Sequence, residues 1–437
     1  MRAEGRARLL FLVIVSTALA ILASRDARAA SEVEAKVQAL RMVGTITGGR
    51  LTIDDPLFEQ IVARLKAGEA EAAADLVAKS PHFASHLARR LALQMQTPAL
   101  EVGDGKDNDS TAFLIAHFAG AVGTAPSIST IFSENATYLV MAPNGTVHAS
   151  ALSAGQLAAL DWTKSLVRQD GQNVKAPDGS PVALPEKHVG GFATLSDKPN
   201  DGSFAMYGAM AGTNLRMIEG IWQISTGLSL TDVKSTAVPA SFVPKFVPEY
   251  DPNFLQGQGQ PACISCHGGG MASLRHGYAT VADVFDFTGN NGLVYIAAPT
   301  QATMKSLGSD PGKRGRTSTC NLSQNPTPVC NPDSEGADPD NKWDLSLWKT
   351  TGVLNTMKWK GNVSGQGLNE LGRAIGQAGI VYEFLTKRVI GEICPMGTFS
   401  SAEVSAIALA ANPSAEPKGT DDLRTIVAKV ASHPSCL

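Results

Sequence analysis

The sequence predicts a mainly α-helical protein in which helical N-terminal and C-terminal regions flank a mixed, loop-rich middle. Three observations predict this class. Apolar residues recur at i, i+3 and i+4 spacing from residue 31 to about 120. Gly, Ser, Thr and Pro then become frequent between residues 121 and 250, and helical spacing returns from Gly365 onward.

The first 29 residues have the pattern of an export signal. Arginines stand near the start, the run Leu9–Ala23 is apolar or small, and Ala27–Ala29 fits the small-x-small rule for cleavage before Ala30. An uncleaved membrane anchor is the alternative, but the run is shorter than the ~20 residues needed to span a bilayer. We therefore expect a periplasmic or secreted protein without stable membrane insertion.

The mature chain, of about 408 residues, is acidic. Cleavage would remove five Arg and two acidic residues, so that 32 Lys+Arg face 38 Asp+Glu and the formal charge is −6. This charge argues against nucleic acid and anionic membrane surfaces as partners. The length suggests two or three domains of ~150 residues each, and we place the regions at 30–120, 121–250 and 251–437.

Within residues 30–120, three helices have recognisable ends. Asp54-Asp55-Pro56 predicts the start of the first, and Gly68 its end. The alanine-rich residues 69–79 predict the second, and Ser80-Pro81 begins the third. The apolar stripes are Leu57, Phe58, Ile61, Val62 and Leu65 in the first helix, and Phe83, Leu87, Leu91 and Leu93 in the third.

The later regions are less regular. Residues 136–141 suggest one of a few short strands, and Val238–Pro252, with four prolines, should be extended. Residues 310–342 suggest a long surface loop. Helices should follow from Gly365, again at 400–411, and at 420–432 with Thr420 as the N-cap.

The pentapeptide Cys263-Ile264-Ser265-Cys266-His267 is the attachment pattern of a c-type haem. Two thiols three positions apart can form thioethers to one porphyrin, and the adjacent histidine can bind the iron as the proximal ligand. A chance match or a thioredoxin-like CxxC is the alternative. The latter needs a strand–turn–helix setting, whereas three glycines follow His267. We expect covalent haem c on Cys263, Cys266 and His267.

The sequence does not decide which group binds the distal side of the iron. Met304 lies 37 residues beyond His267 and Met357 lies 90 beyond it, and either thioether would raise the reduction potential. Packing in the core is the ordinary role of a methionine. An open or water-bound iron is the remaining alternative.

The other four cysteines suggest two disulfides in an oxidising compartment. Cys320–Cys330 with Cys394–Cys436 is the most economical of three pairings, because it closes one short loop and ties the end of the chain to preceding helices. Zinc binding by four thiolates is the alternative, but neither pair has the close spacing that zinc knuckles favour.

At Cys263–His267 the chain resembles c-type cytochromes, and this resemblance implies covalent haem, electron transfer and a cytochrome c-like helical C-terminal region. Other segments resemble a larger group of exported bacterial single-haem proteins without assigned activity. They are Gly212–Arg216, Trp359–Gly361 and Gly365–Gly367, together with Cys394 and Cys436.

The expected function is therefore electron transfer through one haem, with a redox partner that the sequence does not identify. Two alternatives remain. The first is a haem enzyme with an open iron site that acts on peroxide or a small oxidisable substrate. The second is a non-catalytic envelope protein with a structural haem. The sequence leaves open whether the protein is an enzyme.

Overall fold

The computed structural model describes nine stretches of the chain, which are residues 31–95, 108–134, 136–170, 224–228, 284–286, 294–296, 342–350, 352–366 and 368–437. Of these residues, 58% are helical and 9% are in strands, so the protein is mainly α, as the sequence predicts. The predicted signal peptide, the proline-rich stretch Val238–Pro252 and the loop at 310–341 lie outside the described residues.

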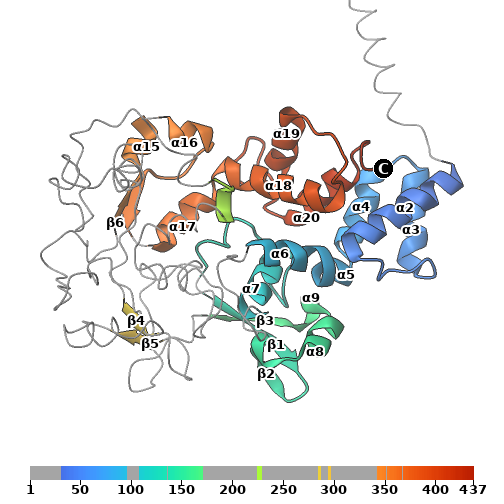
Figure 1. Cartoon of the computed structure of the whole chain (residues 1–437), viewed down its shortest axis with the longest axis horizontal. Helices are drawn as coiled ribbons and strands as arrows, with labels where there is room; N and C mark the ends of the chain where they lie inside the picture. The colour runs from blue at the N-terminus through green and yellow to red at the C-terminus, as the bar shows by residue number, and fades with distance from the viewer. Residues whose placement is uncertain are drawn as a thin grey trace, which may run out of the picture.

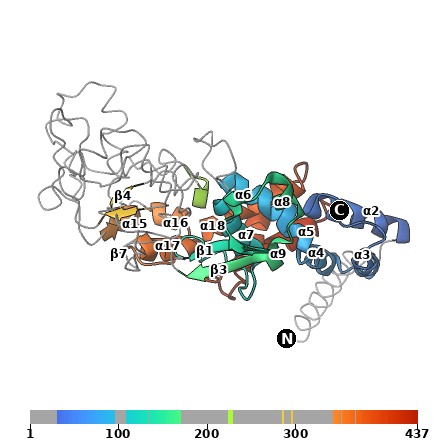
Figure 2. The same cartoon turned by 90° about the horizontal axis from the view of Figure 1, so that it is seen from below.

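The N-terminal region is helical, as predicted. Helices α2 (Glu32–Thr47), α3 (Pro56–Lys66) and α4 (Ala70–Ala78) pack on one another at one end of the described part (Figures 1 and 2). Asp55 caps α3 by accepting a hydrogen bond from the backbone N–H of Leu57 at 2.8 Å. Phe58, Ile61, Val62 and Leu65 form the buried stripe of α3, and Leu57 lies partly buried beside it.

The predicted third helix is one rod with a local change of winding. It consists of α5 (Pro81–Phe83), the π-helical turn η1 (Ala84–Ala88) and α6 (Arg89–Met95). Phe83, Leu87 and Leu91 are buried as predicted. Leu93 is 47% exposed, so its assignment to the stripe was wrong. Two residues after Leu91, a helical side chain points more than a right angle away from it, and Met95 continues the buried face instead.

The middle region contains a small antiparallel sheet of order β2-β1-β3. Strand β1 (Ala136–Ala142) confirms the strand expected at 136–141, and it pairs with β2 (Gly145–Val147) and β3 (Leu166–Asp170). Helix α7 (Asn108–Ala119) packs against β1 (Figure 2). Three short helices connect β2 to β3, namely η2 (Ala149–Ala151), α8 (Ala154–Ala159) and α9 (Trp162–Ser165).

The C-terminal region is also helical. Strands β4 (Val284–Asp286) and β5 (Val294–Ile296) form one antiparallel pair, and β6 (Lys342–Asp344) and β7 (Ser364–Gln366) form another. The helices are α15 (Ser346–Thr350), α16 (Val353–Thr356), α17 (Leu368–Gly376), α18 (Gly379–Ile393), α19 (Ser401–Ala411) and α20 (Leu423–Ala431).

The start of α20 differs from the sequence prediction. Thr420 is not its N-cap, because Asp421 has a left-handed backbone (φ 59°) that separates Thr420 from the helix. Asp422 is the N-cap instead, and its side chain accepts a hydrogen bond from the backbone N–H of Arg424 at 2.9 Å.

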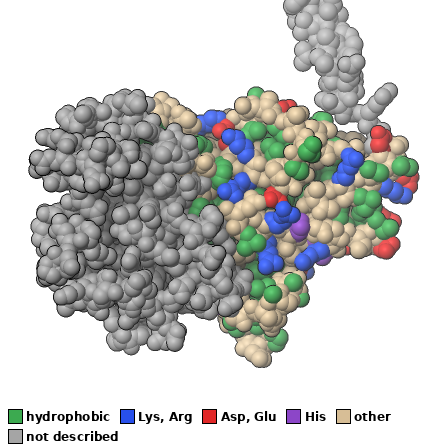
Figure 3. Space-filling view, viewed as in Figure 1, with side chains coloured by type: hydrophobic (Ala, Val, Ile, Leu, Met, Phe, Trp, Pro, Cys, Tyr) green, Lys and Arg blue, Asp and Glu red, His purple; other side chains and the backbone are tan. Residues whose placement is uncertain are grey.

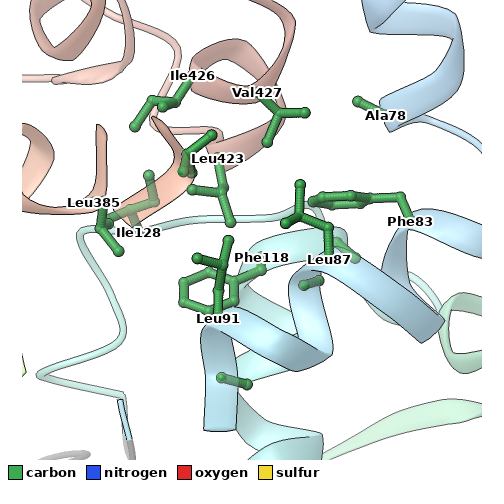
Figure 4. Packing of buried hydrophobic residues seen from close by; sticks show 14 of the residues in the cluster. Ala78, Phe83, Leu87, Leu91, Phe118, Ile128, Leu385, Leu423, Ile426 and Val427 are labelled. Atoms are coloured by element: carbon green, nitrogen blue, oxygen red, sulfur yellow. The ribbon is translucent and has the colours of Figure 1, made fainter. Parts of the chain in front are cut away.

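One hydrophobic cluster joins the helices of the N-terminal and C-terminal regions. Helix α20 packs against α4 and also meets α7 and α18. Figure 4 shows their side chains pointing toward one another: Ala78 of α4, Phe83, Leu87 and Leu91 of the α5–α6 rod, Phe118 of α7, Leu385 of α18, and Leu423, Ile426 and Val427 of α20. The described helices from the predicted regions 30–120 and 251–437 therefore share one core.

A loop of the middle region lies against α17 at two glycines. A Cβ atom on Gly372 would collide with the carbonyl oxygen of Phe132, and one on Gly376 with that of Ser129. Only glycine permits this approach of backbone to helix. Within the described stretches, none of the helices combines the length and the apolar character that crossing a bilayer requires.

Candidate functional site

Most of the predicted haem-site residues lie outside the described part of the chain. These are Cys263, Cys266, His267 and Met304. The structure describes only one of the candidates, Met357. The described part of the chain contains Met357, one cysteine bridge and three polar clusters.

Met357 follows directly after α16 and is fully buried, with 0% of its surface exposed. Its backbone N–H donates to Val353 at 3.0 Å, and its carbonyl accepts from the N–H of Ile380 at 3.2 Å. The side chain belongs to the hydrophobic cluster. Met357 therefore has a packing role in the hydrophobic core. Its role as an iron ligand stays a prediction.

The turn that holds Met357 is stabilised on its other side by Lys358. This residue has a left-handed backbone (φ 51°), and its carbonyl accepts from the N–H of Gly379 at 3.1 Å. Its ammonium group pairs with Glu383 of α18 and donates to Ser405 of α19 at 3.1 Å. Burial raises the pKa of Glu383, but hydrogen bonds from Lys358 and Ser405 outweigh it and lower the pKa overall. Met357 is thus held between α16 and α18.

One of the two predicted disulfides is present in the structure. Cys394, at the end of α18, is bonded to Cys436, which follows α20, with the Cα atoms 5.4 Å apart. The bridge ties the last residues to the helical core, as the pairing predicted. Cys320 and Cys330 lie outside the described residues.

The first polar cluster surrounds the carboxylate of Glu134, between α7 and the sheet. Arg168 donates through Nε to Oε1 at 2.7 Å, and the Tyr138 hydroxyl donates to Oε2 at 2.9 Å. Nε2 of His117 lies 2.8 Å from Oε2, an ion-pair contact when the ring is protonated. The other ring nitrogen, Nδ1, lies 2.8 Å from the carbonyl of Phe113.

This environment lowers the pKa of Glu134 and raises that of Tyr138. Burial raises the pKa of Glu134, but His117, Arg168 and Tyr138 outweigh burial and lower it to about 2. Burial, together with the charge of Glu134, raises the pKa of Tyr138. Glu134 is therefore an anion that is paired with the guanidinium of Arg168. Its side chain is 13% exposed.

The second cluster is centred on Asp421, just before α20. Oδ2 accepts from the hydroxyls of Ser127 at 2.6 Å and Ser129 at 2.7 Å, and Oδ1 accepts from the N–H of Ser129 at 2.9 Å. The Tyr382 hydroxyl also lies 2.9 Å from Oδ1. Burial and the carboxylate together raise the pKa of Tyr382. The cluster joins the middle-region loop to α18 and α20.

The third cluster lies between α6 and α18. Nη1 of Arg388 donates to the backbone carbonyl of Gln94 at 3.0 Å and to its side-chain oxygen at 3.2 Å. The guanidinium lies over the ring of Phe384, 4.4 Å from its centroid. Arg90 pairs with Glu392 at 2.7 Å beside it. Nε of Arg388 is buried without a hydrogen-bond partner.

The sequence reasoning singled out none of Glu134, Asp421 and Arg388. Each makes at least one contact with a residue far away in the chain, namely Arg168, Ser127 or Gln94, and local spacing does not predict those distant partners. The left-handed Asp421 is the nearest to a readable signal, because Asp adopts this backbone more easily than most residues. In the described part of the chain, His, Cys, Asp and Glu form no group of three that could hold a metal ion.

Comparison of the chain with protein-family models, curated proteins and solved structures finds no match.

Proposed function

We propose that the chain is an exported c-type cytochrome that transfers electrons through one covalently bound haem. The observation that carries this proposal is the pentapeptide Cys263-Ile264-Ser265-Cys266-His267. The export pattern of residues 1–29 supports it, because haem attachment of this kind takes place outside the cytoplasm. We propose a periplasmic or secreted location for the same reason.

The residues present fit haem c. The thiols of Cys263 and Cys266 would hold the porphyrin, and the imidazole of His267 would bind the iron. When bound, the haem supplies a one-electron redox centre. The chain's own contribution is to orient it, to exclude water and to set the potential through the distal ligand and the surrounding charges.

The Cys394–Cys436 bridge supports the proposed location. Disulfides persist in exported proteins and are rare in a reducing cytosol. The bridge also accounts for two of the six cysteines. The two thiols of the pentapeptide thus remain available for thioethers if Cys320 and Cys330 pair with each other.

A second candidate function is a haem enzyme with an open iron site. The burial of Met357 in the hydrophobic cluster favours it, because that methionine has a packing role without any iron bond. Addition of cyanide or carbon monoxide to the purified protein distinguishes the two functions. Fast binding to the resting protein favours the enzyme, and slow or absent binding with a reversible redox couple favours the electron carrier.

Covalent attachment is tested by acid–acetone extraction. Haem should stay with the wild-type polypeptide and be lost from the double variant Cys263→Ser, Cys266→Ser, because both thioethers are removed. The matched control is the double variant Cys394→Ser, Cys436→Ser, which removes the disulfide and should keep its haem. Free extraction of haem from the wild type, or no haem in it at all, would contradict the proposed function.

A further inference from the structure

The guanidinium of Arg388 is a half-buried cation, and no ion pair joins it to another described residue. Its hydrogen bonds go to the neutral backbone and side-chain oxygens of Gln94, and no carboxylate in the described part of the chain pairs with it. Burial lowers the pKa of Arg388, and no opposing charge offsets this effect. Charged groups removed from water are normally paired, because desolvation without a partner is costly.

Two donors on one edge of the guanidinium have no hydrogen-bond partner among the described residues. Nη1 is bonded to Gln94, whereas Nε is buried without a partner and Nη2 makes no hydrogen bond within the described residues. Nε and Nη2 form the side-on fork of an arginine, which matches the two oxygens of a carboxylate or phosphate. A buried donor that neither protein nor water satisfies costs about 1–3 kcal/mol, so this edge is suited to an oxyanion.

Two contacts fix the orientation of the guanidinium, and a third supports one of them. Gln94 of α6 holds Nη1, and Phe384 lies against the face of the guanidinium. Gly227, in the segment 224–228, in turn packs so closely on the ring of Phe384 that any Cβ atom there would collide with it. Because the guanidinium is already held in place, binding an anion would cost little side-chain entropy.

The surroundings are rich in positive charge. His86 precedes Arg90 by one helical turn, and its pKa is lowered first by burial and then by the charges of Arg90 and Arg50, against an opposing effect of Glu392. Glu392 pairs with Arg90 and accepts a hydrogen bond from Gln94, and among the described residues no ion pair joins it to Arg388. Figure 3 shows basic and histidine side chains near the centre of the described surface, around α5 and α6. This local surplus contrasts with the net negative charge of the chain.

We propose that the Nε–Nη2 edge of Arg388 binds an oxyanion, either a carboxylate of the haem itself or a free anion such as phosphate. The first source rests on the proposed function, and the second does not. A haem propionate paired with this cation would be held in its charged form, and the pair would bias the reduction potential.

The variants needed are Arg388→Gln, which removes the charge and the fork, and Arg388→Lys, which keeps the charge and removes the fork. Lys387→Gln is the matched control. It removes one positive charge from the neighbouring, exposed position of α18. Each is made in the full chain, exported and matured with haem, and acid–acetone extraction records separately whether haem is attached.

Two measurements then decide the proposal. If the anion is a propionate, the midpoint potential of Arg388→Gln differs from that of the wild type, and Lys387→Gln does not differ. If it is a free anion, inorganic phosphate raises the melting temperature of the wild type and of Lys387→Gln. In that case the dissociation constant of phosphate for Arg388→Gln is at least about tenfold higher than for the wild type.

Equal potentials together with equal phosphate dependence in the wild type and Arg388→Gln would overturn the proposal. If Arg388→Gln does not fold, Arg388→Lys takes its place in the same comparison, and behaviour identical to the wild type in both measurements overturns it. A protein without attached haem contradicts the proposed function, and in that case the phosphate measurement alone decides the role of Arg388.

Discussion

The carboxyl group of Glu134, beside the sheet, has a strongly lowered pKa. Its carboxylate accepts from Arg168 and Tyr138 and faces His117, and its pKa falls to about 2. A carboxyl group with a lowered pKa stabilises the fold above its unfolded pKa and loses that contribution as the pH falls through the folded value. The window for Glu134 is therefore from about 4.5 down to about 2.

We predict that Glu134→Gln lowers the melting temperature most at neutral pH and that the difference from wild type shrinks towards pH 2. The lost stability at pH 7 should be up to about 3 kcal/mol, because the shift corresponds to about that free energy. Thermal melts at pH 7, 5 and 3 measure it. Glu59→Gln on the exposed face of α3 is the control and should show a small, pH-independent effect. A constant difference at all three pH values would contradict the prediction.

Met304 and Met357 are the predicted distal ligands. The burial of Met357 changes how they should be tested, because Met357→Ala would leave a cavity that costs about 2–5 kcal/mol whatever its role. Leucine conserves the volume and removes the sulfur. We predict that Met304→Leu or Met357→Leu abolishes a weak charge-transfer band at the red end of the ferric spectrum and lowers the potential. Unchanged spectra and potentials in both variants would leave the iron open or bound by another group.

At the scale of elements, the contact between α17 and the loop of residues 127–133 depends on glycine. A Cβ at Gly376 would meet the carbonyl oxygen of Ser129, and the same loop is tied to Asp421 by hydrogen bonds from Ser127 and Ser129. The loop therefore cannot move away from the helix without breaking bonds to a carboxylate, which are stronger than bonds between neutral groups.

We predict that Gly376→Ala destabilises the protein by about 1–3 kcal/mol, the usual cost of overpacking. The matched control is Gly391→Ala in α18, where no atom lies within 4 Å of the added Cβ. That substitution should be neutral or stabilising by up to about 1 kcal/mol, because alanine favours the helix. Denaturation of the two variants in urea measures the difference. Equal stability would show that the loop moves away freely.

Asp421 provides a second test of the same contact. Asp421→Ala should cost about 2–4 kcal/mol, since four donors lose their acceptor and alanine is strained in a left-handed backbone. Asp421→Asn should cost less, because asparagine tolerates that backbone and keeps one oxygen. Thermal melting of both variants gives the order. The prediction fails if Asp421→Asn is the more damaging of the two.

At the scale of the whole molecule, one core holds together helices from both halves of the chain, and the Cys394–Cys436 bridge closes the last of them onto it. The bridge spans a separation of 42 residues. A loop of that size loses about 3–4 kcal/mol of unfolded-state entropy when it is cross-linked, and the end of the chain also contacts α2, where Arg41 donates to the carbonyl of Leu437 at 2.5 Å.

We predict that the mature protein contains two disulfides and no free thiol. Intact mass after alkylation, with and without reductant, should show four cysteines that become reactive only on reduction. The double variant Cys394→Ser, Cys436→Ser should lower the melting temperature, whereas Cys320→Ser, Cys330→Ser should leave the described core intact. Labelling of Cys320 or Cys394 in the unreduced protein would contradict the prediction.

Much of the helical fold is readable in the sequence. The stripe of α3 and its cap at Asp55 are local patterns, and so is the strand at 136–142. The two errors concern single residues. Leu93 looks like part of an apolar stripe until the winding of the rod places it outside, and Thr420 looks like a cap until Asp421 turns the backbone.

The sequence by itself determined the helical class, the haem-attachment pattern and the export pattern, because each depends on spacing along the chain. It favoured the pairing of Cys394 with Cys436 among three possible pairings, and the structure contains that bridge. Only the tertiary structure decided that α4 and α20 share a core. It also decided that Glu134 and Asp421 accept hydrogen bonds from distant segments, and that Nε of Arg388 is buried without a hydrogen-bond partner. Burial and ion pairing depend on residues that folding brings together. No local sequence pattern specifies which distant side chain will contact a given residue.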